Sequence, residues 1–456
     1  MFLSHYLLRG REKMKSSLLC LLVIWLKVIP SYAQPRVYSL KDCISILENN
    51  KDIQLGRKLV EREMFETIIT KDTFLPNIAI SSQQGLSFGR VLDPTTYDFV
   101  TNLTMHDISA SIGGSVTLFS GLERLYQVKK SNLNLNYAEL DLDRKKNNLT
   151  LEMTKVFLEI LMDKEALDIY ENKIDLLKKQ EIMIARKVDN QTATTGDLLN
   201  VQADITRAQV EYSSAKNEWE LDKVAICEML EIDDWQTFDV SFDSWDNVEP
   251  HIWNIEDLLL DAQRLPQIRQ KKVAVELAKR DVQIAASSYW PVLKINAGYG
   301  STFSNARFRA TGEEYMFFDQ LRDNMNAYIT VSLNIPLTSA MTVSHAIKER
   351  KKAVETSELE LQRTLIAMDK EVKQTIVHVN TAYEKYQLLA KEVEKDTESL
   401  RQTEVKYNAG AATYFDYQIA VGNLFQAQAE RLRARYEYIY WTKIMDYYSG
   451  KMSNPL

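Results

Sequence analysis

Four stretches of the chain alternate apolar and polar residues, and this period of two predicts β-strands with one apolar and one polar face. They lie near residues 78–88, 108–118, 293–303 and 326–335. In the second stretch, Ile108, Ala110 and Ile112 alternate with Ser109 and Ser111. The polar faces are rich in Ser, Thr, Asn and Gly. Each strand is predicted to run about 12–15 residues, enough to cross hydrocarbon at a tilt. The stretches pair as two hairpins, at 76–119 and 291–337.

Each hairpin is followed by a long segment without Gly or Pro, at 122–195 and at 337–409. Apolar residues recur there every seven positions, which is typical of helices that pack as coiled coils. The first series contains Val128, Leu135, Leu142, Leu149 and Val156, and the second contains Leu365, Val372, Val379, Tyr386 and Val393. The pattern predicts long helices at 121–190 and 339–407, each followed by a turn and a shorter helix, at 197–230 and 412–447.

The chain contains one module twice. The segment Ser39–Met229 is echoed by Asn254–Met445, and in each copy a helix ends at a proline before the hairpin, at Pro76 and Pro291. A repeat of this length indicates two copies of a large unit and not a solenoid. The predicted organisation is a first repeat at 34–230, a connecting equatorial segment at 231–253, a second repeat at 254–447 and a tail at 448–456.

The N-terminal residues 1–33 have the pattern of a secretory signal peptide. Basic residues precede an apolar run from Leu18 to Ile29, and the small-residue triplet Ser31-Tyr32-Ala33 follows it. The predicted cleavage is after Ala33, and either Met1 or Met14 serves as the start of such a signal. The sequence therefore predicts export across the inner membrane.

Composition excludes several classes of function. Residues 1–33 contain five basic residues and one acidic residue, so their removal moves the formal net charge from −7 to −11, which argues against nucleic acid as a partner. Two cysteines remain, Cys43 and Cys227, and the sequence leaves open whether they form a disulfide. The remaining histidines lack metal-ligand spacing, and no phosphate-binding or nucleophile motif occurs. We expect no enzyme, no cofactor and no metal site.

The strand count bears on assembly. No run after residue 33 is long and apolar enough for a transmembrane helix, so an exported chain of this kind would enter a membrane as strands. Four strands are too few to close a membrane barrel, whose smallest examples have about eight. Two chains give a barrel filled by side chains, whereas three chains leave an open bore. The alternative is a periplasmic coiled-coil scaffold or adaptor in which the hairpins form a soluble sheet.

The order of these elements resembles the TolC-like outer-membrane factor family over essentially the whole chain after residue 33. The motifs Tyr407-Asn408-Ala409-Gly410 and Gly196-Asp197-Leu198-Leu199-Asn200 are similar to the two helical tips of that family. The resemblance implies a mixed α and β membrane protein, a homotrimer with one shared twelve-stranded outer-membrane β-barrel that continues into a periplasmic α-helical barrel. Loops 93–106 and 305–323 would then be extracellular.

The resemblance also implies a function and its partners. The chain would be a passive export duct in the outer membrane, in contact with outer-membrane lipid. A periplasmic adaptor (membrane fusion) protein and an inner-membrane pump of RND or ABC type would dock at the tips, and the pump would supply the energy. The exported substrate is not specified by the sequence.

The resemblance assigns channel-gate roles to four tip residues, Asp197, Tyr407, Gly410 and Asp416. It implies a hydrogen bond between Asp197 and Tyr407 that holds neighbouring coils closed, and a threefold ring of Asp416 carboxylates that favours cations. The chain departs from the family pattern at Ile419 and Ala412, where a second ring acid and a tip arginine can occur. From the residues alone, Asp197 is equally an N-cap, Asp416 a solvated helix-start charge and Tyr407 a packing residue.

Overall fold

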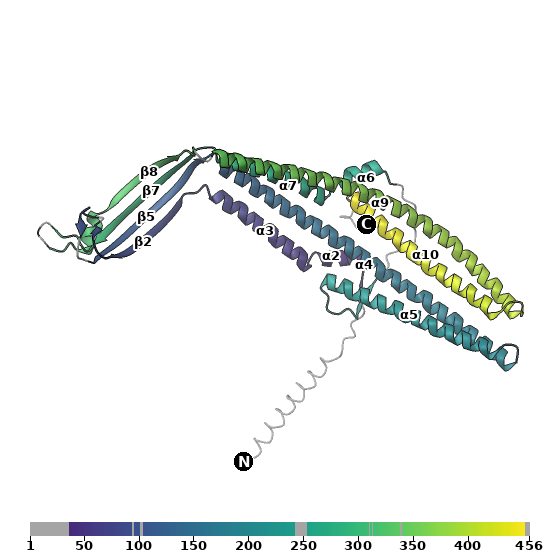
Figure 1. Cartoon of the computed structure of the whole chain (residues 1–456). Helices are drawn as coiled ribbons and strands as arrows, with labels where there is room; N and C mark the ends of the chain where they lie inside the picture. The colour runs from purple at the N-terminus through teal and green to yellow at the C-terminus, as the bar shows by residue number, and fades with distance from the viewer. Residues whose placement is uncertain are drawn as a thin grey trace, which may run out of the picture. The chain divides into compact units, whose positions relative to one another are not determined.

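The computed structural model describes residues 36–93, 95–100, 104–241, 253–309, 311, 313–337 and 340–451 (Figure 1). The predicted signal peptide, 1–33, lies outside these residues. The chain divides into two compact units. The helical unit comprises 1–47, 153–248 and 391–436, and the sheet unit comprises 48–152, 249–390 and 437–456.

The sheet unit contains one four-stranded antiparallel sheet, which Figure 1 shows in the order β2-β5-β7-β8. The strands are β2 (Asn77–Ser87), β5 (Met105–Ser120), β7 (Val292–Ser304) and β8 (Asn326–Asn334). Each predicted hairpin is present, and β5 pairs with β7 to join them. The strands have 11, 16, 13 and 9 residues, so β2 and β8 are shorter and β5 is longer than expected.

The register brings the predicted apolar positions of the four strands onto one face, except at Leu118, where a bulge in β5 makes Phe119 and not Leu118 the partner of Leu293. Ile78 lies opposite Gly114, which is followed across the sheet by Ala297 and Ile329. The next row toward the helices contains Val116, Ile295 and Val331. The opposite face has rows of Ser and Thr, and the hydroxyls of Ser81 and Ser111 are hydrogen bonded at 2.8 Å. Because successive side chains of a strand point to opposite faces, the alternating apolar and polar residues give the sheet one apolar and one polar face.

The segments between the hairpin strands carry small elements that the sequence pattern did not predict. Strands β3 (Val91–Leu92) and β4 (Phe99–Val100) pair in one loop, and helix α8 (Phe317–Asp323) lies in the other. Gln320 of α8 is fully buried, where its amide accepts a hydrogen bond from the Ser304 amide and donates one to the Ser304 carbonyl. The Ser304 hydroxyl donates to buried Asp93.

Four long helices follow the hairpins: α4 (Glu123–Asp189), α5 (Thr195–Leu230), α9 (Ala340–Asn408) and α10 (Tyr414–Tyr448). They correspond to the predicted helices 121–190, 197–230, 339–407 and 412–447. Among the described residues, no helix is both long and apolar enough to span a bilayer.

The helix that begins each repeat is broken in two. The first copy has α2 (Leu40–Leu47) and α3 (Lys51–Asp72), and the second has α6 (Ile255–Ala262) and α7 (Pro266–Ser287). Asn50 caps α3, and Pro266 begins α7 at a position that needs no amide hydrogen. A two-stranded parallel sheet, which the sequence pattern did not predict, pairs β1 (Arg36–Tyr38) with β6 (Phe238–Val240) from the connecting segment.

Candidate functional site at the helical tips

The turn between α9 and α10 is a Schellman motif. The Gly410 amide donates to the Tyr407 carbonyl at 3.2 Å, and the Ala411 amide donates to the Lys406 carbonyl at 2.8 Å. These two bonds pair carbonyls that a helix end leaves free. Gly410 has a φ of 74°, a left-handed conformation that glycine adopts without steric cost. Gly410, which the sequence analysis assigned to the tip, therefore ends α9.

The turn between α4 and α5 has the same hydrogen bonds without a glycine. The Gln191 amide donates to the Val188 carbonyl at 2.9 Å, and the Thr192 amide donates to the Lys187 carbonyl at 2.7 Å. Gln191 holds the left-handed position with a φ of 57°. The duplicated turn was therefore harder to recognise in the first copy, where the expected glycine is absent.

A capping box begins each shorter helix, and the N-cap residue of α5 is Thr194 and not Asp197, which lies three residues later. At α5, the Thr194 amide and hydroxyl donate to Asp197 Oδ2 at 3.0 and 2.8 Å, and the Asp197 amide donates back to the Thr194 hydroxyl. At α10, Thr413 and Asp416 make the same three bonds, with the Thr413 hydroxyl 2.7 Å from the carboxylate. Each box satisfies free amides of a first helical turn, and both carboxylates lie near the positive end of the helix dipole.

The structure brings Asp197 and Tyr407 close together but gives them different hydrogen-bond roles from those the resemblance implied. Asp197 accepts its hydrogen bonds from Thr194. Burial, with a further contribution from the negative charge of Asp197, raises the pKa of Tyr407 above its ordinary value. The Lys187 ammonium lies 4.0 Å from the centroid of the Tyr407 ring, within cation–π range. In this chain Tyr407 is a buried packing residue beside the charge of Asp197.

Asp416 is exposed and ionised. Hydrogen bonds from the Thr413 hydroxyl and then from its amide lower the pKa of the Asp416 carboxyl. The large apolar side chains of Phe415 and Ile419, one on each side of it in sequence, are 66% and 46% exposed. Ala412, which replaces the expected tip arginine, packs against the apolar core of the tips. The exposed surface at this end of α10 thus combines one carboxylate with two apolar side chains.

An aromatic core joins the two hairpins of helices within the helical unit. Tyr407, Tyr414 and Tyr417 pack with ring centroids 5.9–6.4 Å apart. The core contains buried residues from both hairpins: Ile174, Leu177, Ile184, Val201, Ile205 and Ala208 from the first, and Leu400, Tyr407, Tyr414, Tyr417, Ala420, Val421, Leu424 and Phe425 from the second. Burial raises the pKa of Tyr417 to about 12, with smaller contributions from Glu404 and Tyr407.

Asp204 of α5 is a charged residue within this core that the sequence pattern did not predict as a site residue. It is only 7% exposed. The Tyr414 hydroxyl donates to Asp204 Oδ2 at 3.1 Å, and the Gln418 amide donates to Asp204 Oδ1 at 2.8 Å. The available sequence signal was its position on the apolar stripe of Val201, Ile205 and Ala208, where a carboxylate is unexpected.

A second group of carboxylates lies elsewhere in the helical unit, between α4 and α5. Burial, followed by the charges of Asp222, Glu218 and Glu159, raises the pKa of Asp163 to about 7. The Arg433 guanidinium opposes this shift. Burial first, and then the charge of Glu159, also raises the pKa of Asp222, which is hydrogen bonded to Asp163. This arrangement resembles two acids that share one proton.

Among the residues that the structure describes, no group of three or more His, Cys, Asp or Glu side chains is arranged to hold a metal ion. Cys43 and Cys227 are buried free thiols. Burial raises the pKa of Cys43 to about 12 and that of Cys227 to about 11, so both remain protonated at neutral pH.

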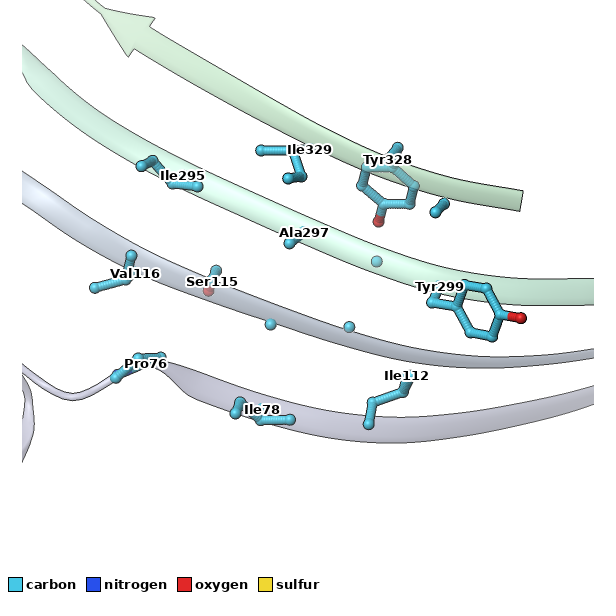
Figure 2. A pocket seen from close by; sticks show the side chains of 14 residues that line it. Pro76, Ile78, Ile112, Ser115, Val116, Ile295, Ala297, Tyr299, Tyr328 and Ile329 are labelled. Atoms are coloured by element: carbon cyan, nitrogen blue, oxygen red, sulfur yellow. The ribbon is translucent and has the colours of Figure 1, made fainter. Parts of the chain in front are cut away.

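The sheet unit supplies the second part of the candidate site, a two-faced wall. Its apolar face contains an open hollow of about 420 Å³, lined by side chains that include Ile78, Ile112, Ala297 and Ile329 (Figure 2). Pro76 lies between α3 and β2, and Pro291 lies between α7 and β7. Both prolines therefore stand at helix–strand junctions, and Trp290 beside Pro291 packs edge-to-face on Phe119.

Comparison with known proteins points to one family. Residues 260–440 match the family model described as outer membrane efflux protein. A region of 170 residues is 23% identical to outer membrane protein TolC of Vibrio cholerae, and this region spans 37% of the present chain and 37% of that relative.

Solved structures extend the likeness to nearly the whole chain. VceC, an outer membrane protein of Vibrio cholerae, has a TM-score of 0.77 at 12% identity, over 90% of this chain and 96% of VceC. The CmeC outer membrane channel of Campylobacter jejuni has a TM-score of 0.78 at 15% identity, over 91% of this chain and 86% of CmeC. These likenesses confirm the predicted fold class of each chain, a mixed α and β protein with long helices and a β-sheet.

Proposed function

This chain belongs to the outer membrane efflux protein family through residues 260–440, and on that premise we propose that it is one subunit of an outer-membrane channel for passive export. The channel extends into the periplasm and carries substrates to the exterior. It is one component of a tripartite efflux or type I secretion system. Its chemistry is confined to binding and passage, and the chain itself is not an enzyme.

The observation that carries this proposal is the two-faced sheet with open edges. Strands β2 and β8 end the sheet within one chain. On the apolar face, Ile80 and Ile329 are 81% and 79% exposed. Exposed apolar side chains suit lipid, but unpaired strand edges are too unfavourable to leave in hydrocarbon. Both requirements are met when three chains pair edge to edge as a twelve-stranded barrel.

The polar face then lines the water-filled bore. Its Ser, Thr and Asn side chains form hydrogen bonds with water, and Asp107 and Lys294 on the same face add one charge of each sign. The segments 93–106 and 305–323, at the ends of the hairpins away from the helices, are extracellular loops. The family's mode of action implies that a periplasmic adaptor protein and an inner-membrane pump, of RND or ABC type, engage the helical tips.

Asp416 is proposed as the selectivity residue at the periplasmic entrance. Three chains bring three copies of this ionised carboxylate to one ring, which attracts cations and repels anions. The exposed side chains of Phe415 and Ile419 accompany it on the same helical turns. The entrance therefore combines a negative ring with an apolar constriction.

Fractionation and conductance test the proposal. The protein should sediment with outer membranes and require detergent for extraction, whereas the periplasmic scaffold alternative predicts release by osmotic shock. In planar bilayers, the purified wild type should form cation-preferring channels. A wild type that is monomeric without detergent and does not conduct would exclude the channel.

The selectivity role is tested by Asp416→Asn, which removes the charge but keeps an oxygen that can cap α10. We expect the cation preference to fall, as measured by reversal potential in a salt gradient. Glu355→Gln is the matched control, because it removes one carboxylate from an exposed position of α9 in the sheet unit. An unchanged reversal potential in Asp416→Asn would exclude the ring.

A further inference from the structure

Asp204 is a buried charge in a core that is otherwise apolar and aromatic. It belongs to α5 of the first hairpin, whereas Tyr414 and Gln418 belong to the first turns of α10 in the second hairpin. Asp204, Tyr414 and Gln418 together form the Asp204 cluster. Its two inter-hairpin hydrogen bonds, at 3.1 and 2.8 Å, connect the hairpins directly through polar groups.

The cluster satisfies the carboxylate on both oxygens. Oδ2 accepts from the Tyr414 hydroxyl, and Oδ1 accepts from the Gln418 amide and from the Arg207 guanidinium at 2.8 Å. Arg207 is one turn away on the same helix, and its side chain is 65% exposed. The Arg207 contact therefore stays within α5, while the other two contacts depend on α10 remaining in place.

A buried carboxylate is a poor choice for stability alone. An apolar side chain of similar size usually packs at least as favourably, and removal of the partners from a buried charge is strongly unfavourable. Such a group instead favours the one arrangement of its neighbours that satisfies its hydrogen bonds, because other arrangements leave a buried charge unpaired. At Asp204, the arrangement so defined is the position of α10 on α5.

We propose that Asp204 is the positioning residue that holds the second helical hairpin against the first at the periplasmic entrance. In this proposal, exchange of Tyr414 and Gln418 for water at the Asp204 carboxylate is the local step that lets α10 move and the entrance widen. The inference rests on the proposed channel function. It assigns the inter-hairpin hydrogen bond to Asp204 and Tyr414, since Asp197 is engaged by its own cap.

The position of Tyr414 links this step to the entrance. Tyr414 is the first residue of α10, and it directly precedes exposed Phe415 and the capping carboxylate of Asp416. A displacement of Tyr414 from Asp204 therefore also moves the residues proposed to form the constriction. Burial, and then the charge of Asp204, raises the pKa of Tyr414, so its hydroxyl remains a donor at physiological pH.

The test is single-channel recording from purified wild type, Asp204→Ala and Tyr414→Phe. Asp204→Ala leaves the buried Tyr414 hydroxyl and the half-buried Gln418 amide without their acceptor. We expect the ratio of open to closed time to rise about tenfold or more, as for loss of hydrogen bonds to a charged group. Tyr414→Phe keeps the aromatic ring and removes one donor, so a smaller rise is expected. Thr206→Ala is the control, because the exposed Thr206 hydroxyl donates to the Gln202 carbonyl within α5, and this variant should behave as wild type.

A double-mutant cycle distinguishes loss of the Asp204–Tyr414 hydrogen bond from a general destabilisation of the helical tips. In the Asp204→Ala background, Tyr414→Phe should have little further effect on the open ratio, because its partner is already absent. Full additivity of the two changes, or a wild-type open ratio in Asp204→Ala, would overturn the proposal. Failure of the channel function would abolish conductance in the wild type. Failure of this proposal alone would leave a conducting wild type whose open ratio is unchanged by Asp204→Ala.

Discussion

At the residue scale, the junction between β5 and α4 depends on Gly121. Gly121 has a φ of 63° and the next residue, Leu122, has a φ of 69°, so the chain makes two left-handed steps before α4 begins. A Cβ atom on Gly121 would lie 2.4 Å from the Ser287 carbonyl oxygen and 2.7 Å from the Trp290 Cβ. Backbone strain and overlap with α7 therefore act together at this position.

We expect Gly121→Ala to lower the unfolding free energy by more than about 1 kcal/mol, the loss typical of alanine at a positive φ. Thermal unfolding of the detergent-solubilised protein measures the change. Gly89→Ala is the matched control, because Gly89 has a φ of 97° and no atom within 4 Å of the added Cβ. Equal losses in the two variants would show that the contact with α7 contributes nothing.

The carboxyl group of Asp163 makes stability depend on pH. Its folded pKa of about 7 lies above its ordinary value of 3.8, so the folded chain holds a proton that the unfolded chain releases. The unfolding free energy should therefore decrease as pH rises from about 4 to about 7, with the loss complete above that range. At alkaline pH the half-buried carboxyl group of Asp163 is ionised among Glu159, Glu218 and Asp222.

Asp163→Asn removes this titration and keeps the shape of the side chain. The midpoint of thermal unfolding should fall less between pH 5 and pH 8 in this variant than in wild type. Asp168→Asn, at an exposed position of the same helix, should keep the wild-type pH dependence. Parallel pH profiles for wild type and Asp163→Asn would contradict the assignment.

These residues mark the limit of what the sequence could predict about the site. Asp197, Tyr407, Gly410 and Asp416 were found because they belong to recognisable turn and tip motifs. Asp204 and Asp163 were missed because a carboxylate on a helix is ordinarily solvated, and burial becomes visible only when other helices pack against it. Asp197 forms its hydrogen bonds with Thr194 in its own capping box, and this local bonding competes with a longer-range bond to Tyr407.

At the element scale, the two faces of β8 should tolerate charge differently. Ile329 belongs to the apolar face proposed to meet lipid, and the adjacent Thr330 belongs to the polar face proposed to meet water. Lysine on the lipid face near the bilayer midplane costs about 2–4 kcal/mol, whereas a lumen position has no such penalty. Ile329→Lys should therefore reduce the folded, membrane-inserted fraction much more than Thr330→Lys.

The measurement is the amount of each variant resistant to protease in outer-membrane fractions, compared with total protein. The two substitutions add the same side chain at neighbouring positions, so each serves as the control for the other. Equal insertion of both variants would exclude a lipid-facing Ile329. The reverse order would indicate that the apolar face points into the bore.

Periodicity predicted the long elements well and the short ones poorly. Period two and period seven repeat enough times in β5, β7, α4 and α9 to be recognised over local variation. Helix α8 has 7 residues and the β1–β6 pair has 3 residues per strand, so neither shows a period. Their positions depend on tertiary contacts, such as the bonds of Gln320 to Ser304 and the ion pair of Lys164 with Asp239 at 2.7 Å.

At the scale of the whole molecule, the proposed barrel requires β8 of one chain to pair with β2 of the next. Within one chain β5 and β7 separate these strands. At about 4.8 Å per strand spacing, β2 and β8 are roughly 14 Å apart, beyond the reach of a disulfide. A disulfide between these edge strands therefore reports contact between chains.

Thr330→Cys, combined in turn with a cysteine at Ala79, Ser81 or Gln83 of β2, samples the possible registers on the polar face. The buried native thiols are first replaced, as Cys43→Ser and Cys227→Ser. Mild oxidation in membranes should give bands of two and three linked chains on a denaturing gel for the pair in register, and no larger species. Because successive residues point to opposite faces, Ile329→Cys with the same β2 partners should stay unlinked. A ladder that stops at two chains would instead indicate an eight-stranded dimer, whose bore would be filled by side chains and closed to export.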